Sequence, residues 1–179
     1  MSEEKVHEYI LKLVLLGDPA VGKTSLINQY VDHTFKTDYQ PTLGANIIAK
    51  EIKMNQIKTT TKLIIWDIAG QKTYDLSRKL FFQGCSGALF IYDITRASTF
   101  ENIKDKWLQD FQKFGKTKAA FILIGNKTDL TEIRSVKKET GEKLADDINA
   151  IDFIETSAKY GENVELAFKK LINQVISDE

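Results

Sequence analysis

The stretch that decides the fold is GDPAVGKT, residues 17–24, which follows the apolar run ILKLVLL at residues 10–16. Its glycines, lysine and threonine fit the pattern G-x-x-x-x-G-K-[ST] at every fixed position. A backbone that curls around phosphate oxygens needs glycine where a side chain would intrude. A helix that begins at the end of such a loop adds free N–H groups and the positive end of its dipole. Because the motif lies between a strand-like run and a helical stretch at 24–30, we predict a phosphate-binding loop.

Within this loop, Lys23 supplies a positive charge for the β- and γ-phosphates, and the Thr24 hydroxyl supplies a ligand for Mg²⁺. The residues that we expect to hold the phosphates are Asp18, Pro19, Ala20, Val21, Gly22, Lys23, Thr24 and Ser25. The loop alone leaves ATP and GTP equally open.

Apolar runs alternate with helical patterns along the rest of the chain, which indicates an α/β protein with helices on both faces of a sheet. The expected strands are 10–16, 46–54, 59–67, 88–92, 119–124 and 153–154, and the expected helices are 24–30, 99–114, 136–148 and 164–176. The second and third strands are split by the polar pair Asn55-Gln56 and read as an antiparallel hairpin. In such sheets ligands bind beyond the carboxyl ends of the strands.

The length, charge and cysteine content of the chain exclude several classes of function. The 179 residues suggest one domain over 1–179, with a flexible tail at 1–8. Lys+Arg and Asp+Glu are both 25, so the formal charge is zero, which argues against nucleic acid as a partner. No apolar run has the length of a membrane span, and MSEEKVHEY lacks a secretory signal. A single cysteine, Cys85, fits a reducing compartment, so we expect a cytoplasmic protein. We also expect it to be a monomer.

Two loops predict which base is bound. Asp129, in the sequence Asn126-Lys127-Thr128-Asp129, can accept two hydrogen bonds on one carboxylate, and guanine offers N1–H and N2–H₂ side by side. Adenine has no such pair of donors, so this contact can discriminate by about 10⁴. We expect Asn126 to tie this loop to the phosphate loop and the stem of Lys127 to cover the base. A second loop supplies Ser157, Ala158 and Lys159, with the Ala158 N–H directed at the guanine carbonyl.

Together these motifs resemble the Ras superfamily of small GTPases, over about residues 10–176, and most closely its Rab branch. The segments that carry the Rab resemblance are KLIIWD at 62–67, FFQGC at 81–85 and YDIT at 92–95. The resemblance implies a P-loop NTPase fold, a three-layer sandwich of a six-stranded, mostly parallel sheet and five helices.

The resemblance also implies two segments that sense the γ-phosphate. In the first, about 35–44, Thr42 would bind Mg²⁺ through its hydroxyl and the γ-phosphate through its N–H. In the same segment Phe35 would pack edge-on against the guanine, and Tyr39 would also contact the nucleotide. In the second, Asp67 would hold Mg²⁺ through water. Its neighbours act on the reaction itself: the Gly70 N–H would bond the γ-phosphate, and Gln71 would orient the attacking water. We therefore expect Gln71, Lys23, Thr42 and Gly70 to serve catalysis, with GTP/GDP and Mg²⁺ as cofactors.

The expected partners are an exchange factor, a GTPase-activating protein and effectors. They would recognise the loss of the γ-phosphate through residues 35–47 and 67–80. The chain departs from Rab usage at 43–47 and at Lys72-Thr73, where partners read identity. It ends without the cysteine that Rab proteins prenylate, so membrane surfaces enter only through a lipidated tail beyond residue 179. The three arginines, Arg78, Arg96 and Arg134, lie outside 35–44, which predicts slow hydrolysis without a partner.

Two other functions stay open. One is a module that holds GTP without hydrolysing it, and the other is a P-loop kinase that uses ATP, which Asp129 and the few arginines oppose. Pro19 is the residue least typical of the loop, because proline fixes φ near −65° and removes an N–H donor. We expect Pro19 to alter hydrolysis while leaving nucleotide binding largely intact.

Overall fold

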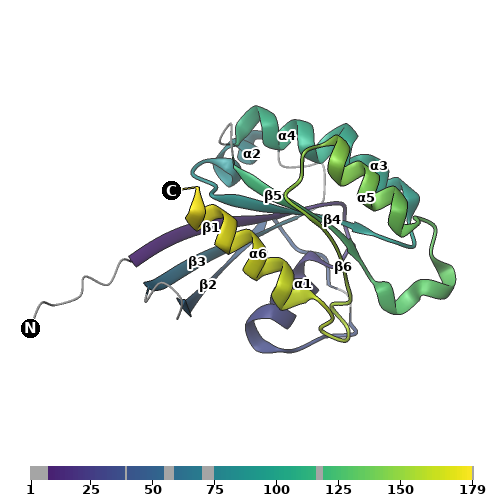
Figure 1. The fold of residues 1–179 in the computed structure, drawn as a ribbon, viewed down its shortest axis with the longest axis horizontal. Helices are drawn as coiled ribbons and strands as arrows, with labels where there is room; N and C mark the ends of the chain where they lie inside the picture. Colours follow the sequence, from purple (N-terminus) through teal and green to yellow (C-terminus); the bar gives the residue numbers. More distant parts are fainter. Residues whose placement is uncertain (1–7, 39, 55–58, 70–74, 116–118, 179) are drawn as a thin grey trace, which may run out of the picture.

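A computed structural model describes residues 8–38, 40–54, 59–69, 75–115 and 119–178. Within them the strands form a single six-stranded sheet in the order β2-β3-β1-β4-β5-β6 (Figure 1). The strands are β1 Glu8–Leu16, β2 Ala45–Met54, β3 Thr59–Ile68, β4 Gly87–Asp93, β5 Ala120–Asn126 and β6 Phe153–Thr156. The hairpin pair β2 and β3 is antiparallel and every other neighbouring pair is parallel, which confirms the predicted sheet.

The apolar runs become strands because their side chains alternate between two cores. In β1, Leu11, Leu13 and Leu15 are buried in the core on one face of the sheet. Val14 and Leu16 are buried in the core on the other face. β1 begins at Glu8, one residue inside the tail that we expected over 1–8, and residues 1–7 lie outside the described part of the chain.

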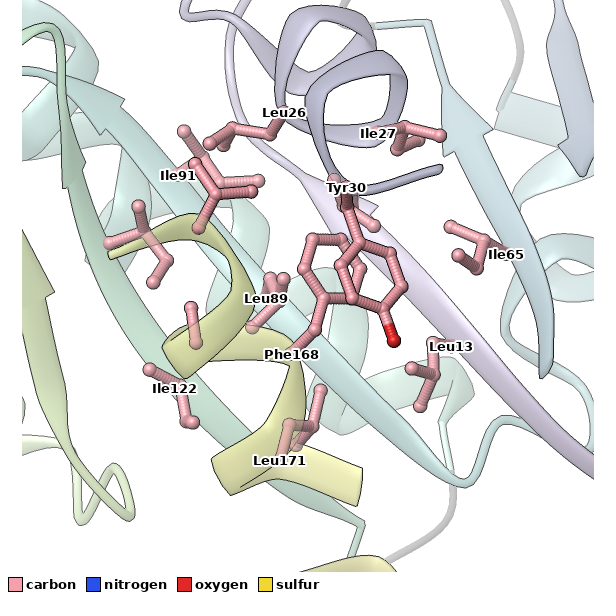
Figure 2. Packing of buried hydrophobic residues seen from close by; sticks show 14 of the residues in the cluster. Leu13, Leu26, Ile27, Tyr30, Ile65, Leu89, Ile91, Ile122, Phe168 and Leu171 are labelled. Atoms are coloured by element: carbon pink, nitrogen blue, oxygen red, sulfur yellow. The ribbon is translucent and has the colours of Figure 1, made fainter. Parts of the chain in front are cut away.

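Helices cover both faces of the sheet (Figure 1). On one face α1 Lys23–Asp32 packs beside α6 Val164–Ser177, where the rings of Tyr30 and Phe168 stack with centroids 4.0 Å apart (Figure 2). The other face carries α2 Asp75–Phe82, α3 Ala97–Asn102, α4 Leu108–Phe114 and α5 Lys138–Asp147. The three-layer sandwich predicted from the sequence is therefore confirmed.

The predicted helix at 99–114 is one continuous helical body in three parts, because the π-helical turn η2 Ile103–Trp107 joins α3 to α4. Within the described residues, α1, α2, the body α3–η2–α4, α5 and α6 match the expected five helices. A short 3₁₀ helix, η3 Thr128–Ile133, is added after β5. The apolar pattern did not locate α2. In the described part of the chain, every helix is too short or too polar to cross a bilayer.

The parallel pairing brings the carboxyl ends of β1, β3, β4, β5 and β6 to one edge of the sheet. The glycine loop follows β1, and the two loops predicted to read the base follow β5 and β6. Motifs more than a hundred residues apart in the sequence are thus placed side by side.

Candidate nucleotide site

The phosphate loop, residues 17–22, has a backbone that only small residues allow. Gly17 and Gly22 have φ values of 153° and 103°. A Cβ at Gly17 would lie 2.1 Å from the Ile91 carbonyl oxygen, and one at Gly22 would lie 2.2 Å from Nδ2 of Asn126. Both glycines of the motif are therefore required by close approach. Ala20 also has a positive φ, 61°, a strained conformation for a residue with a Cβ that the sequence pattern did not reveal.

Lys23 is the buried cation of this loop. Its ammonium donates to the carbonyl oxygens of Gly17 and Asp18, both at 2.8 Å. Burial lowers the pKa of Lys23 to about 8, although Asp67 and Asp18 oppose this effect. The nearby carboxylates thus do not offset the cost of burying the ammonium charge, and an anionic ligand in the loop would stabilise it.

Three oxygen-bearing side chains converge beside Lys23. The Thr24 and Thr42 hydroxyls lie 3.0 Å apart, Thr24 donates to Oδ2 of Asp67, and Thr42 lies 3.4 Å from the same oxygen. Burial raises the pKa of Asp67, and the contacts with Thr24, Lys23 and Thr42 oppose that rise. Oδ1 of Asp67 is buried without a hydrogen-bond partner among the described residues. A hard divalent cation such as Mg²⁺, which prefers oxygen ligands, fits this donor set.

The loop after β5 is tied to its neighbours as predicted. Nδ2 of Asn126 donates to the Val21 carbonyl at 2.9 Å, which joins this loop to the phosphate loop. Its Oδ1 accepts from the Thr156 hydroxyl at 2.9 Å and from the Ala158 N–H at 3.3 Å. The Ala158 N–H that we expected to meet guanine is thus directed at Asn126 in this structure.

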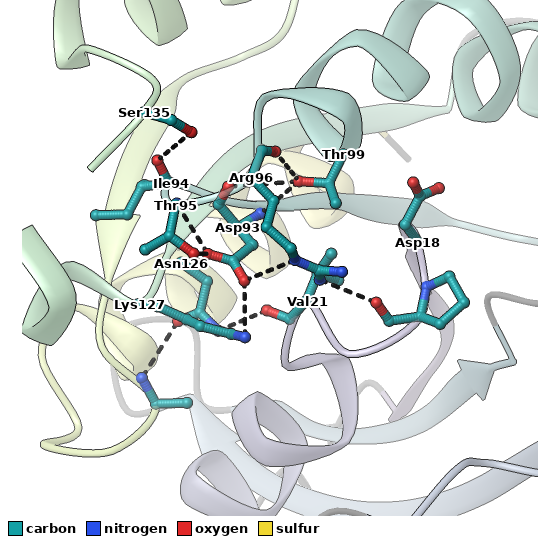
Figure 3. A network of polar contacts seen from close by, with 12 residues as sticks. Asp18, Val21, Asp93, Ile94, Thr95, Arg96, Thr99, Asn126, Lys127 and Ser135 are labelled. Carbon is teal, nitrogen blue, oxygen red and sulfur yellow. Dashed lines mark hydrogen bonds and ion pairs between the residues drawn. The ribbon is translucent and has the colours of Figure 1, made fainter. Parts of the chain in front are cut away.

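The acidic and basic side chains of this loop are also held in place. Oδ1 of Asp129 accepts from the Ser157 hydroxyl at 2.7 Å, so the two predicted base-reading loops are joined. Lys127 has a φ of 74°, and its ammonium pairs with Asp93 at 2.7 Å (Figure 3). That contact with Lys127 helps to hold the pKa of Asp93 below its usual value, against the effect of burial.

These elements enclose one cleft of about 920 Å³. Of the predicted site residues, it is lined by Pro19, Ala20, Gly22, Lys23, Thr24, Ser25, Phe35, Thr42, Asp67, Asn126, Lys127, Asp129, Ala158 and Lys159. Asp18, Val21 and Ser157 lie behind this lining and hold it through hydrogen bonds. Tyr39, Gly70 and Gln71 lie outside the described residues, so their predicted roles stay predictions.

Several residues around the cleft escaped the sequence analysis as site residues. The Asp93 carboxylate accepts from the Arg96 guanidinium at 3.0 Å, and the same guanidinium donates to the Pro19 carbonyl at 3.0 Å (Figure 3). Asn102 and Trp107 donate to Asp18. The segment at 92–95 had served only as a point of resemblance, and nothing local in the sequence marks Arg96, Asn102 or Trp107 as neighbours of the phosphate loop.

Comparison with known proteins agrees with this geometry. Residues 12–177 match the family model described as "Ras family". The chain is 39% identical to Ras-related protein RABA6b of Arabidopsis thaliana, over 98% of this chain and 76% of that protein. It is 37% identical to Ras-related protein Rab-1 of Theileria parva, over 92% of this chain and 73% of that protein. It is also 37% identical to human Ras-related protein Rab-8B, over 97% and 82% of the two chains.

Proposed function

The chain belongs to the Ras family and is a small GTPase, an enzyme that hydrolyses GTP, and on that premise we propose how its cleft works as a Mg²⁺-dependent switch. The observation that carries the proposal is the joining, in one cleft, of Lys23, the oxygen cluster of Thr24, Thr42 and Asp67, and the carboxylate of Asp129. These groups match, in order, the phosphates, the cation and the base of a guanine nucleotide.

Guanine recognition rests on Asp129. Asp129 lines the cleft, and the hydrogen bond from Ser157 orients its carboxylate. Adenine would displace water from this carboxylate without donating hydrogen bonds to it. The carboxylate would then be buried without partners, which strongly disfavours adenine. Phe35 and Lys127 also line the cleft, and the ring of Phe35 and the stem of Lys127 would offer apolar contact to the purine ring.

Hydrolysis uses the other end of the cleft. Thr24, Thr42 and Asp67 would hold Mg²⁺, which supplies charge neutralisation for the phosphates when it is bound. Lys23 would bond the β- and γ-phosphates, the Gly70 N–H would bond the γ-phosphate, and Gln71 would orient the attacking water. Loss of the γ-phosphate would release Thr42 and Gly70 together, so both segments would relax.

Partner proteins would read this change at residues 35–47 and 67–80. Leu43, Ile47 and Leu80 support this assignment, because their side chains are 81%, 53% and 63% exposed. Exposed apolar side chains next to a nucleotide-sensing segment suit protein docking. We therefore propose an exchange factor, an activating protein and effectors as partners, with a role in vesicle trafficking at membrane surfaces.

The test is binding of GTP, GDP and ATP to the purified chain, followed by hydrolysis with and without Mg²⁺. We expect tight binding of both guanine nucleotides, weak binding of ATP, and slow turnover that requires Mg²⁺. Asp129→Asn should abolish the guanine preference, which can reach about 10⁴, while the exposed Asp147→Asn should leave it unchanged. A guanine preference that survives in Asp129→Asn would refute the assignment of the base.

Pro19 is the residue of the cleft that we expect to alter the rate of hydrolysis. Its carbonyl is held by Arg96, and its ring lines the cleft. Single-turnover hydrolysis by the unaltered chain and by Pro19→Gly tests this expectation. We expect hydrolysis in both, at different rates, with GDP affinity largely unchanged. Equal rates in the two proteins would show that Pro19 has no part in the reaction.

A further inference from the structure

The phosphate loop is held from outside the cleft by one helical body. Nδ2 of Asn102 donates to Oδ2 of Asp18 at 2.6 Å, and Nε1 of Trp107 donates to Oδ1 of the same carboxylate at 2.8 Å. The partners are 84 and 89 positions apart in the sequence. Asp18 and Trp107 are 8% and 2% exposed, so both hydrogen bonds lie largely out of water. Each oxygen of the carboxylate thus has its own neutral donor.

The π-helical turn explains how two residues five positions apart reach one carboxylate. In an α-helix, positions i and i+5 lie on different sides of the axis, because the repeat is 3.6 residues. In a π-turn the hydrogen bonds run between i and i+5, and such residues stack on one side. The turn η2 spans Ile103–Trp107, and the Leu108 N–H donates to the Ile103 carbonyl in that pattern. Asn102 and Trp107 therefore face the phosphate loop together.

The contacts of the Asp18 carboxylate matter because this negative group lies in a loop that is predicted to bind anionic phosphates. The backbone carbonyl of Asp18 already accepts from the Lys23 ammonium at 2.8 Å. A buried carboxylate that loses its donors must find others, and the Lys23 ammonium, which already contacts the Asp18 backbone, is a charged donor close to it. Paired with Asp18 in that way, Lys23 would be drawn from the phosphates, and the loop backbone would move with it.

We propose that Asn102 and Trp107 are positioning residues for the nucleotide: by fixing the Asp18 carboxylate they leave Lys23 and the loop N–H groups free for the phosphates. This inference rests on the proposed function, since it presumes that the cleft binds a guanine nucleotide. The helical body α3–η2 thereby sets how long the nucleotide stays bound, although neither side chain touches it.

The first test is the rate at which a fluorescent GDP analogue leaves the protein in the presence of Mg²⁺. Trp107→Phe keeps an aromatic ring and removes the donor, and it should release the analogue roughly tenfold faster, the effect of one hydrogen bond to a charged group. Trp66→Phe is the matched control, because Nε1 of Trp66 is buried without a hydrogen-bond partner among the described residues. It should release the analogue at the rate of the unaltered protein.

The second test exchanges donor and acceptor. Asn102→Asp places two carboxylates face to face and should also speed release at least tenfold. Combined with Asp18→Asn, the pair regains an amide opposite a carboxylate, so release should slow again toward the original rate. Asn173→Asp, on the exposed side of α6, controls for the added charge. Circular dichroism at the assay temperature checks that every variant is folded.

The outcomes separate this inference from the proposed function. If the unaltered protein does not bind the GDP analogue, the proposed function itself is wrong. If it binds, but Trp107→Phe releases the analogue as slowly as Trp66→Phe, the inference is overturned and the function stands. A double variant that releases as fast as Asn102→Asp alone would also overturn it, because a purely structural role for Asn102 predicts no rescue.

Discussion

The two ends of the cleft are held in different ways. At the base-reading end, Asn126 makes three hydrogen bonds and Asp129 is fixed by Ser157. Behind them a bidentate pair joins Arg134 to Glu155 at 2.5 and 3.1 Å. At the γ-phosphate end, residues 36–38 are exposed and lie outside any helix or strand, and Thr42 is anchored by the oxygen cluster that would receive the cation.

This difference indicates that the two ends of the cleft have different roles. Under the proposed function, the half held by these hydrogen bonds (the preformed half) would bind the part of the nucleotide that GTP and GDP share, which favours tight binding of both. The other half (the responsive half) would be ordered by contacts with the cation and the γ-phosphate, so it would respond to loss of that phosphate. The predictions below test this contrast, from the largest expected effect to the smallest.

The strongest test of the preformed half is Asn126→Ala. The change removes three buried hydrogen bonds and the link to the phosphate loop, which together cost about 3–4 kcal/mol. We expect affinity for GDP and GTP to fall equally, by about 10²–10³ in calorimetric titration. The exposed Asn173→Ala should have no effect. A loss confined to GTP would contradict the division into two halves.

The corresponding change in the responsive half is Thr42→Ala. Because Thr42 would contact the cation and the γ-phosphate only, GDP affinity should stay within about twofold, while single-turnover hydrolysis of GTP should slow by about 10²-fold. Thr37→Ala, exposed in the same segment, is the control. An equal loss of GDP affinity would show that this segment also belongs to the preformed half.

Lys23 lies between the halves and should act on both nucleotides alike. Phosphates raise the pKa of a bound lysine, so binding above the free-state pKa of about 8 requires uptake of a proton. Affinity should therefore be constant below pH 8 and fall up to about tenfold per pH unit above it. Lys23→Met should bind more weakly and lose that slope. An unchanged slope in the variant would assign it to another group.

The smallest effect concerns strain in the phosphate loop. Ala20 has a φ of 61°, which costs about 1 kcal/mol in a residue with a Cβ. Ala20→Gly should therefore raise the melting temperature of the nucleotide-free protein by about 2–4 °C. Ala49→Gly, at an exposed position with ordinary geometry inside β2, should lower it. A fall for Ala20→Gly would mean that the loop gains more from the alanine methyl than the strain costs.

Much of the candidate site could be predicted because its chemistry is local. The spacing of Gly17, Gly22, Lys23 and Thr24 defines a loop whose backbone the structure confirms down to the close approach at each glycine. The bond from Asn126 to the phosphate loop was likewise expected and is present. Each of these features depends on a few neighbouring residues and on the strand that precedes them.

Other features could not be predicted, since they depend on contacts between distant segments. Asp18 looked like one more phosphate-loop residue, yet its side chain is directed at Asn102 and Trp107. Arg96 was noted only as one of three arginines, and the fold brings it to Pro19 and Asp93. The apolar periodicity that located the helix at 99–114 did not show the π-turn within it, because one added residue hardly disturbs the pattern.

The sequence by itself determined that this chain has a phosphate loop and an alternating α/β fold, and it predicted that the loops after β5 and β6 read guanine. Those properties follow from residue types at fixed short spacings and from strand and helix periodicity. Only the tertiary structure decided what holds the phosphate loop in place. The reason is physical: the position of α3–η2 against β4 is set by side-chain packing on one face of the sheet, and that packing selects which donors meet the buried carboxylate of Asp18.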